Sequence, residues 1–331
     1  MRIKMSTIMQ TTTKLGQEDR RAWLKAHLGI DRMGHRVEPG LYSLGKPVSD
    51  SPVFVTANYK LSFNALRSQL GDMDCYILVL NTEGINVWCA AGKGTFGTEE
   101  LVRRIESVNL KDIVKPRTLI LPQLGAPGVA APEVRKRTGF RVEWGPIRAS
   151  DIPEYMRTRE ANGEMRRVRF DVKDRMEVIP VEIKNIFVPL AVALVVLFLL
   201  GMQGTGFMIL TIVLAGVVVF PILLPLLPAH DFASKGFVLG VFASIPFMGR
   251  AYFASVNEAP WVALVSTILP ALMISPWVAF LALNFTGSTT FTSRTGVRRE
   301  IFRYIPVMAV TFILGIGLEV GFVVAKWYGV I

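Results

Sequence analysis

The chain has 331 residues, of which 51% are hydrophobic, and carries a formal net charge of +11 at pH 7. This composition excludes an ordinary soluble domain. Two cysteines also exclude a disulfide framework and an iron–sulfur cluster, which takes about four cysteine ligands. Most of the positive charge precedes Ile186. No basic stripe alternates with aromatic residues, so we expect contact with membrane lipid and no nucleic-acid partner.

The first part of the chain, residues 1–41, is predicted to be an N-terminal extension. Its opening stretch, "MRIKMSTIMQTTTKLGQEDRRAWLKAH", lacks the long apolar segment of a secretory signal peptide. We therefore expect the N-terminal part of the protein to stay in the cytoplasm.

Residues 42–165 alternate between strand and helix patterns. Short runs rich in β-branched residues predict strands at 52–58, 74–81, 85–88 ("INVW"), 118–123 and 140–146. Helical spacing predicts helices at 61–71, 97–110 (capped by Thr98), 128–139 and 150–158. This alternation is typical of a Rossmann-like α/β domain with a parallel sheet, in which ligands bind at loops beyond the carboxyl ends of strands.

The second half of the chain is predicted to be an all-α transmembrane domain, residues 186–331, reached through a connecting segment at 166–185. Five apolar runs are long enough to cross a bilayer, at 186–203, 206–228, 236–255, 260–284 and 304–327. The fourth link between them is rich in arginine, with Arg294, Arg298, Arg299 and Arg303. The positive-inside rule places this link in the cytoplasm, which an odd number of spans also requires when the N-terminus is inside. We therefore predict a multi-pass protein of the cytoplasmic (inner) membrane.

One glycine-rich stretch, "NVWCAAGKGTFGT" (86–98), carries the chemistry of the first domain. It is not a Walker A loop, because its glycines are misplaced and Gly94 follows Lys93. Zinc ligation fails because the three histidines are scattered. Cys75 falls within an apolar strand and is expected to be an inert buried thiol. Cys89 begins a short helical turn, where a thiolate is favoured, although a simply packed cysteine is equally compatible with the spacing.

The same stretch resembles the cap-helix motif of the membrane corrinoid proteins of microbial mercury methylation. The flanking segments "SPVFVTANYKLSFNALRSQL", "LILPQLGAPGVAAPEVRKRTGFRVEWGP" and "RRVRFDVKDRMEVIPVEI" extend the resemblance over about residues 42–183. They are also similar to the corrinoid domain of the corrinoid iron–sulfur protein of the acetyl-CoA pathway. The five-helix tail is similar to the mercury-methylation family alone.

This resemblance implies a cobalamin-type corrinoid in its base-off form, with Cys89 as the lower axial ligand of cobalt and as the catalytic residue. Thr56 would lie beside the corrin. The implied cofactor-binding residues are Thr56, Asn86, Val87, Trp88, Cys89, Ala90, Ala91, Gly92, Lys93, Gly94, Thr95, Thr98, Gln123, Leu124, Gly125 and Gly128. The Asp-x-His-x-x-Gly signature of histidine-ligated corrinoid proteins is absent from the sequence.

The family implies a corrinoid-dependent methyltransferase that forms methylmercury. A soft thiolate trans to a cobalt–methyl bond favours transfer of a carbanion-like methyl group to Hg(II). Such a transfer leaves Co(III), so each turnover needs two electrons. The implied partners are a ferredoxin-type 4Fe–4S protein, a folate- or pterin-linked methyl donor system and the substrate Hg(II), in an anaerobic organism.

Two other functions remain open on the sequence. One is a membrane-bound corrinoid methyl carrier of one-carbon metabolism, which would share every feature above. The other is a transporter, for which Glu319 within the last apolar run is the best support. Without an inverted repeat, we expect the membrane domain to act chiefly as an anchor.

Overall fold

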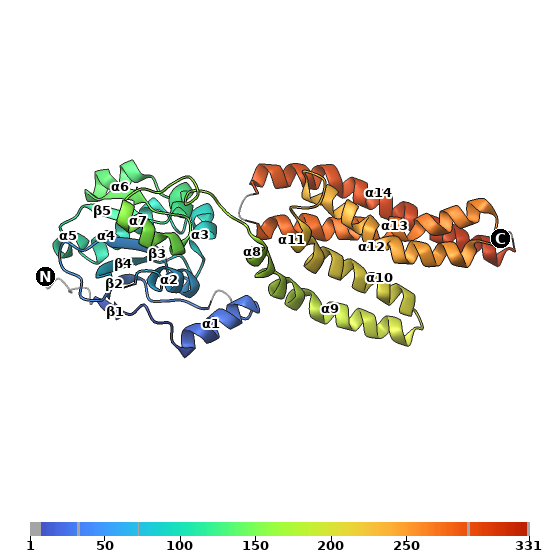
Figure 1. The fold of residues 1–331 in the computed structure, drawn as a ribbon, viewed down its shortest axis with the longest axis horizontal. Coiled ribbons are helices and arrows are strands. Elements are labelled where there is room, and N and C mark those ends of the chain that lie inside the picture. The colour runs from blue at the N-terminus through green and yellow to red at the C-terminus, as the bar shows by residue number, and fades with distance from the viewer. Residues whose placement is uncertain (1–7, 32–33, 72, 290–291, 330–331) are drawn as a thin grey trace. The chain divides into compact units, whose positions relative to one another are not determined.

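A computed structural model of the chain describes residues 8–31, 34–71, 73–289 and 292–329, with the side chain of Arg294 excepted. The first seven residues of the expected extension, together with Arg32 and Met33, lie outside the described residues. The chain divides into two compact units, Met1–Val168 and Arg169–Ile331. The first contains a sheet with helices and the second is helical (Figure 1).

The first unit is built on a six-stranded mixed sheet with the order β1-β2-β4-β3-β5-β6. The four strands from β3 to β6 run parallel, whereas β2 pairs antiparallel with β4 and β1 runs parallel to β2. The strands are β1 (Met9–Thr11), β2 (Gly40–Leu44), β3 (Val53–Ala57), β4 (Cys75–Leu80), β5 (Thr118–Leu121) and β6 (Arg141–Trp144). The expected α/β class is therefore confirmed, with two additional strands at one edge.

Helices cover both faces of this sheet because its central strands are apolar on both sides. The helices are α1 (Gln17–His27), α2 (Lys60–Arg67), α3 (Val87–Lys93), α4 (Thr98–Ser107), α5 (Leu110–Ile113), α6 (Ala131–Thr138) and α7 (Ile152–Thr158), with 3-10 turns η1 (Gln123–Gly128) and η2 (Ala149–Asp151). Side chains of α3, α4 and α6 share one buried cluster with Val53 and Val55. Side chains of α2 and α7 share the other cluster with Phe54.

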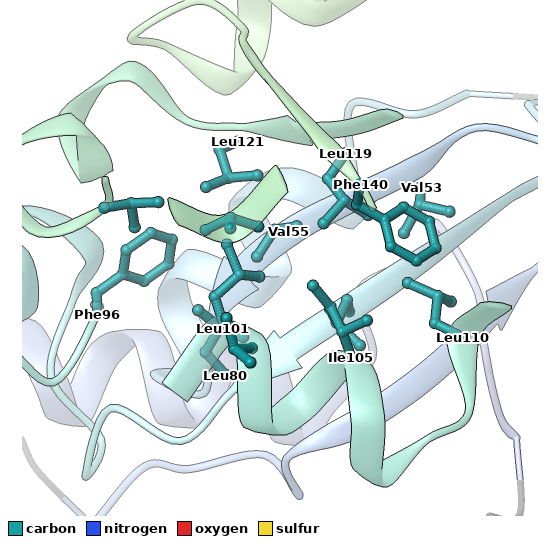
Figure 2. Packing of buried hydrophobic residues seen from close by; sticks show 14 of the residues in the cluster. Val53, Val55, Leu80, Phe96, Leu101, Ile105, Leu110, Leu119, Leu121 and Phe140 are labelled. Carbon is teal, nitrogen blue, oxygen red and sulfur yellow. The ribbon is translucent and has the colours of Figure 1, made fainter. Parts of the chain in front are cut away.

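The cluster beneath α3, α4 and α6 extends along the length of the strands. Figure 2 shows Phe96 at one end, near the last residues of β4 and β5, and Phe140 at the other end, near Val53. Phe96 is completely buried. It therefore anchors the loop after α3 to the carboxyl end of the sheet, where the sequence predicts the ligand site.

Two local predictions were wrong. Residues 85–88 do not form a strand, because Asn86 caps a helix that begins at Val87. Thr98 is the first residue of α4 and does not cap it, since Gly97 holds that position. The Thr98 hydroxyl instead accepts a hydrogen bond from the Ala130 N–H at 2.8 Å and so joins the start of α4 to the residue before α6.

The N-terminal segment is tied to α2 by a buried arginine. Arg67 is 6% exposed, and its guanidinium donates to the carbonyl oxygens of Thr12 and Lys14 at 2.5 and 3.0 Å. It also contacts Asp19 of α1 at 2.7 Å. Burial raises the pKa of Asp19, but hydrogen bonds from the Gly16 N–H, Asn64 and Arg67 outweigh it and leave the pKa below its usual value. The segment before β2 is therefore held by charge as well as by packing.

The second unit has five helical stretches long and apolar enough to cross a membrane, as the sequence predicted. They span Val172–Leu199, Gln203–Leu223, Phe232–Ser255, Pro260–Ser288 and Thr295–Trp327. Their elements are α8 (Val172–Met176), α9 (Ile179–Leu199), α10 (Gln203–Val213), η3 (Leu214–Val219), α11 (Phe220–Leu223), α12 (Phe232–Ser255), α13 (Pro260–Asn284), η4 (Phe285–Ser288) and α14 (Arg294–Trp327).

The fourth link is shorter than the sequence suggested. Arg298, Arg299 and Arg303 lie in the first turns of α14, because Ser293 caps this helix by accepting from the Gly296 N–H at 3.1 Å. Arginine has a high helix propensity, so the helix continues well beyond the apolar run. Glu319 lies on the same helix and is exposed.

We predict that Arg67→Leu destabilises the protein by about 3–5 kcal/mol, because it removes a buried guanidinium from Asp19 and from two backbone carbonyl oxygens, and leaves Lys60, at 3.5 Å, as the remaining cation beside Asp19. The thermal melting transition of the purified chain measures this loss. Lys115→Met is the control, since Lys115 and Asp50 form an exposed ion pair at 3.1 Å that contributes less than about 1 kcal/mol. Equal melting temperatures for the two variants would contradict the anchoring role of Arg67.

Candidate functional site

The Cys89 site begins with a short helix whose N-terminus is held by a side chain. The Oδ1 atom of Asn86 accepts a hydrogen bond from the Cys89 N–H at 2.8 Å, and α3 ends at Lys93, followed by Gly94 as the C-cap with a φ of +87°. Val87, Ala90 and Ala91 are buried in the cluster beneath the helix. The seven residues thus form a short helix that is capped by Asn86 at its start and by Gly94 at its end.

Cys89 lies on the more accessible side of α3. Its side chain is half-buried, as is Trp88, whereas Gly92 and Lys93 are exposed. Residues three and four apart share one face of a helix, so Cys89, Gly92 and Lys93 are neighbours there. Gly92 adds no side chain beside the thiol, which leaves the sulfur approachable by a flat ligand.

The second predicted loop packs directly against this helix. A Cβ atom on Gly128 of η1 would lie 3.1 Å from the Cα of Ala91 and would collide with the carbonyl oxygen of Phe96. A Cβ on Gly125 would lie 2.5 Å from the ring of Phe96. Only glycine permits these contacts. The structure therefore brings together the two stretches that the sequence proposed, 86–98 and 123–128.

The other predicted residues occupy distinct positions. Thr56 is 3% exposed and, because alternate residues of a strand point to opposite faces, it lies on the face of β3 away from α3. Gln123 accepts a hydrogen bond from Arg166 at 2.8 Å, and Leu124 packs against the core cluster. The Thr95 hydroxyl is buried without a hydrogen-bond partner among the described residues.

A polar cleft of about 650 Å³ adjoins η1 through Arg166. Its walls include Glu143, Trp144, Tyr155, Arg159, Glu160 and Arg166. The Tyr155 hydroxyl donates to Glu143, and burial together with this hydrogen bond raises the pKa of Tyr155. The cleft thus combines charges of both signs at the carboxyl end of β6.

A buried asparagine that the sequence analysis missed organises the approach to α3. The Oδ1 atom of Asn58, just after β3, accepts from the Thr82 N–H and the Gly84 N–H at 3.0 Å each. Thr82 in turn donates from its hydroxyl to the Ile85 carbonyl oxygen at 2.7 Å. Glu83 and Gly84 have φ angles of 58° and 76°. Asn58 therefore holds the tight turn that leads from β4 into α3. In the sequence, Asn58 and Asn81 each directly follow a central strand, and this repeated position could have indicated their role in the turn.

A buried carboxylate supports the same turn from below. Glu100 accepts from the Asn81 N–H at 2.7 Å and pairs with Arg104 at 2.8 Å and with Arg103. Burial raises the pKa of Glu100, but these hydrogen bonds prevail and leave it below its ordinary value. Glu100 is thus held ionised beneath the β4–α3 turn.

The second cysteine has no place in this site. Cys75 is completely buried in β4, and burial raises the pKa of its thiol to about 12. Within the described ranges, no three His, Cys, Asp or Glu side chains come together as a metal site. Cys89 is therefore the thiol available for ligand chemistry.

Residues 28–156 match the family profile described as CO dehydrogenase/acetyl-CoA synthase delta subunit. Over 127 residues the chain is 35% identical to the gamma subunit of the acetyl-CoA decarbonylase/synthase complex of Methanopyrus kandleri, covering 38% of this chain and 27% of that protein. Over 129 residues it is 31% identical to the corrinoid/iron–sulfur protein large subunit of Moorella thermoacetica, covering 38% and 28%.

The chain spans about a quarter of the length of these curated relatives. The profile match lies wholly within the first unit and includes α3, η1 and Asn58. The first unit is therefore related to subunits of the acetyl-CoA synthase and corrinoid protein group, as the sequence resemblance led us to expect.

We predict that Asn58→Ala loosens the turn before α3, because two buried N–H groups lose their acceptor at a cost of about 2–3 kcal/mol. Amide hydrogen exchange should become faster at Thr82, Gly84 and along α3. Ser68→Ala, which removes an exposed hydroxyl contact, is the control and should change nothing there. Unaltered exchange in Asn58→Ala would show that the turn is held by other contacts.

Thiol alkylation of the folded chain at pH 8 should distinguish the two cysteines. We expect iodoacetamide to modify Cys89 and to leave Cys75 unmodified, since the Cys75 thiol is buried and protonated at that pH. Cys75→Ala should then label like the wild type and Cys89→Ala should resist labelling until unfolded. Labelling of Cys75 at the rate of Cys89 would contradict the packing of β4.

Proposed function

We propose that the first unit binds a cobalamin-type corrinoid at the α3–η1 surface, with the Cys89 thiolate as the lower ligand of cobalt. The observation that carries this proposal is the position of Cys89. It lies on the accessible side of a helix at the carboxyl end of the sheet, within the residues that match the family profile. Ligands of open α/β sheets bind at this edge.

The residues present fit such a group. The Thr95 hydroxyl is buried and lacks a partner among the described residues, so it offers one hydrogen bond to a ligand. Because Gly92 and Gly128 have no side chains, nothing projects from the surface beside Cys89 and Ala91 at these two positions. Asn86 differs from its expected role, because its Oδ1 atom already accepts from the Cys89 N–H. We therefore propose that Asn86 positions the thiol and does not contact the cofactor through that atom.

A bound corrinoid supplies a cobalt centre that accepts and releases a methyl group. Cys89 would act as a strongly donating, soft ligand, and strong donation favours departure of the methyl group with its electron pair. A methyl group that leaves in this way suits a soft electrophile. We therefore propose Hg(II) as the acceptor and methylmercury as the product, which makes the protein a corrinoid-dependent mercury methyltransferase.

Electron balance then defines the partners. If the methyl group arrives as a cation equivalent and leaves with both bonding electrons, each turnover would take two electrons from the site, and a reductant would have to return them. This chain's two cysteines are too few for an iron–sulfur cluster. We propose a ferredoxin-type 4Fe–4S protein as the electron donor and a folate- or pterin-linked system as the methyl donor.

The second unit supports a cytoplasmic orientation for these reactions. Two hydrogen bonds of 3.3 Å, from Ser288 to Glu182 and from the Phe232 N–H to Glu300, bring the starts of α9, α12 and α14 and the end of α13 to one end of the unit. Lys235, Arg298, Arg299 and Arg303 lie at this end. We propose, by the positive-inside rule, that this end faces the cytoplasm of the inner membrane and that the chain enters the membrane at α9 from that side.

A second candidate function is supported by the comparisons. The relatives are named as subunits of the acetyl-CoA decarbonylase/synthase complex and as a corrinoid/iron–sulfur protein. The chain would then be a membrane-bound corrinoid methyl carrier of one-carbon metabolism. Cys89 would have the same structural position, and the methyl acceptor would differ.

One experiment separates these functions. Membranes containing the protein, supplied with thiol-bound Hg(II), a methyl-folate donor system and reduced ferredoxin, should form methylmercury, and Cys89→Ala membranes should form none. Cys89→His should retain cofactor but react slowly, because imidazole donates less than thiolate. A corrinoid spectrum without any methylmercury would favour the one-carbon carrier. Wild-type rates in Cys89→His would refute the argument from ligand softness.

A further inference from the structure

Arg175 is a buried cation that forms no ion pair in the part of the chain that the structure describes. It lies in α8 of the second unit and is 6% exposed. Its Nε–H is buried and meets no acceptor in the described part of the chain, and its guanidinium joins none of the ion pairs found there. Arginine stays protonated at any physiological pH. A buried charge is tolerated only when it is compensated, so this position calls for an anion.

Among the described residues, no carboxylate forms an ion pair with Arg175, and the nearby acidic groups make other contacts. On its own helix, Asp171 and Asp174 form the capping box at the start of α8. At the same end of the unit, Asp231 lies 3.7 Å from Arg303, and Glu300 accepts from two backbone N–H groups at the start of α12. Lys235 and the α14 arginines leave this end with an excess of positive charge.

The position of α8 indicates the source of the anion. The helix α9 begins three residues after α8 ends and has 21 residues, so it is about 30 Å long, which matches the hydrocarbon core of a bilayer. When α9 spans that core, α8 lies at the level of the lipid headgroups. Val172 and Met176, one turn apart on α8, are 46% and 51% exposed and are available to acyl chains.

The core of the second unit fixes α8 in this place. Phe170 before the helix and Val178 after it pack against the buried cluster around Phe285, with the rings of Phe170 and Phe285 6.2 Å apart. These contacts fix the position of α8, and the Arg175 side chain stays buried where an exposed arginine would extend into solvent.

We propose that Arg175 is the headgroup ligand of an anionic phospholipid. The lipid phosphate accepts hydrogen bonds from the guanidinium, and the acyl chains lie over Val172 and Met176. A free phosphate ion would satisfy the charge but would leave these two side chains uncovered, so the geometry favours lipid. This site is independent of the corrinoid and of the methyl acceptor.

Native mass spectrometry of the detergent-purified full chain tests the proposal with phosphatidylglycerol and phosphatidylcholine as probes. We expect the wild type to retain phosphatidylglycerol preferentially and Arg175→Gln to bind it about tenfold more weakly, as loss of a charge-assisted hydrogen bond implies. Arg175→Lys should bind at an intermediate level. Lys173→Gln removes an exposed charge from the same helix and should bind like the wild type.

Three outcomes would overturn the proposal. Equal weakening in Lys173→Gln would show a general charge effect, and displacement of the lipid by millimolar inorganic phosphate would identify a free-ion site. The third outcome needs only the wild-type protein, so this test remains valid even if Arg175→Gln fails to fold. Bound anionic lipid should raise the melting temperature, and equal melting in phosphatidylglycerol and phosphatidylcholine would exclude a specific site.

Discussion

The side-chain amide of Asn58 is the contact on which the arrangement of the first unit's site depends. It joins the carboxyl ends of the two central strands, because it follows β3 and accepts from two N–H groups of the turn after β4. That turn contains two consecutive residues with positive φ and leads directly into the residue that caps α3. The place of Cys89 is therefore set by a chain of hydrogen bonds that starts on a neighbouring strand.

Close packing completes what these hydrogen bonds begin. Gly125 and Gly128 allow η1 to touch Phe96 and Ala91, so the loop after β5 and the helix after β4 form one surface. A rigid, low surface of this kind suits a large flat ligand, since a side chain at either glycine would separate the two elements. The thiol of Cys89 is carried by packed backbone and depends little on the conformation of a flexible loop.

The second unit arranges its charges by a different rule. At the end of the unit that carries Lys235 and the α14 arginines, the acidic side chains make contacts within the unit. Glu300 caps α12, and Asp231 contacts Tyr304 and Arg303. Its arginines and Lys235 remain in excess there. Positive charge therefore gathers at this end of the second unit, and Arg175 forms no ion pair among the described residues.

The sequence alone was sufficient for the features that depend on local pattern. Apolar runs long enough to cross a bilayer predicted five membrane helices, and alternating periodicities predicted the α/β class. The order of β3, α2, β4, α4, β5, α6, β6 and α7 followed from the same periodicities. Glycine-rich stretches at 86–98 and 123–128 marked the two loops that meet. Each of these signals lies within a few consecutive residues, where backbone propensity and hydrophobic spacing act directly.

Tertiary structure decided the features that depend on residues far apart in sequence. "INVW" has the composition of a strand, yet the Asn86 cap and the turn held by Asn58 make it the start of a helix. Thr98 stands where a cap is expected, but its hydroxyl meets Ala130, which is 32 residues away. Arg67 and Arg175 look like surface charges in sequence and are buried in the structure. Local propensity is a weak preference of a few tenths of a kcal/mol per residue, and packing or a buried hydrogen bond exceeds it.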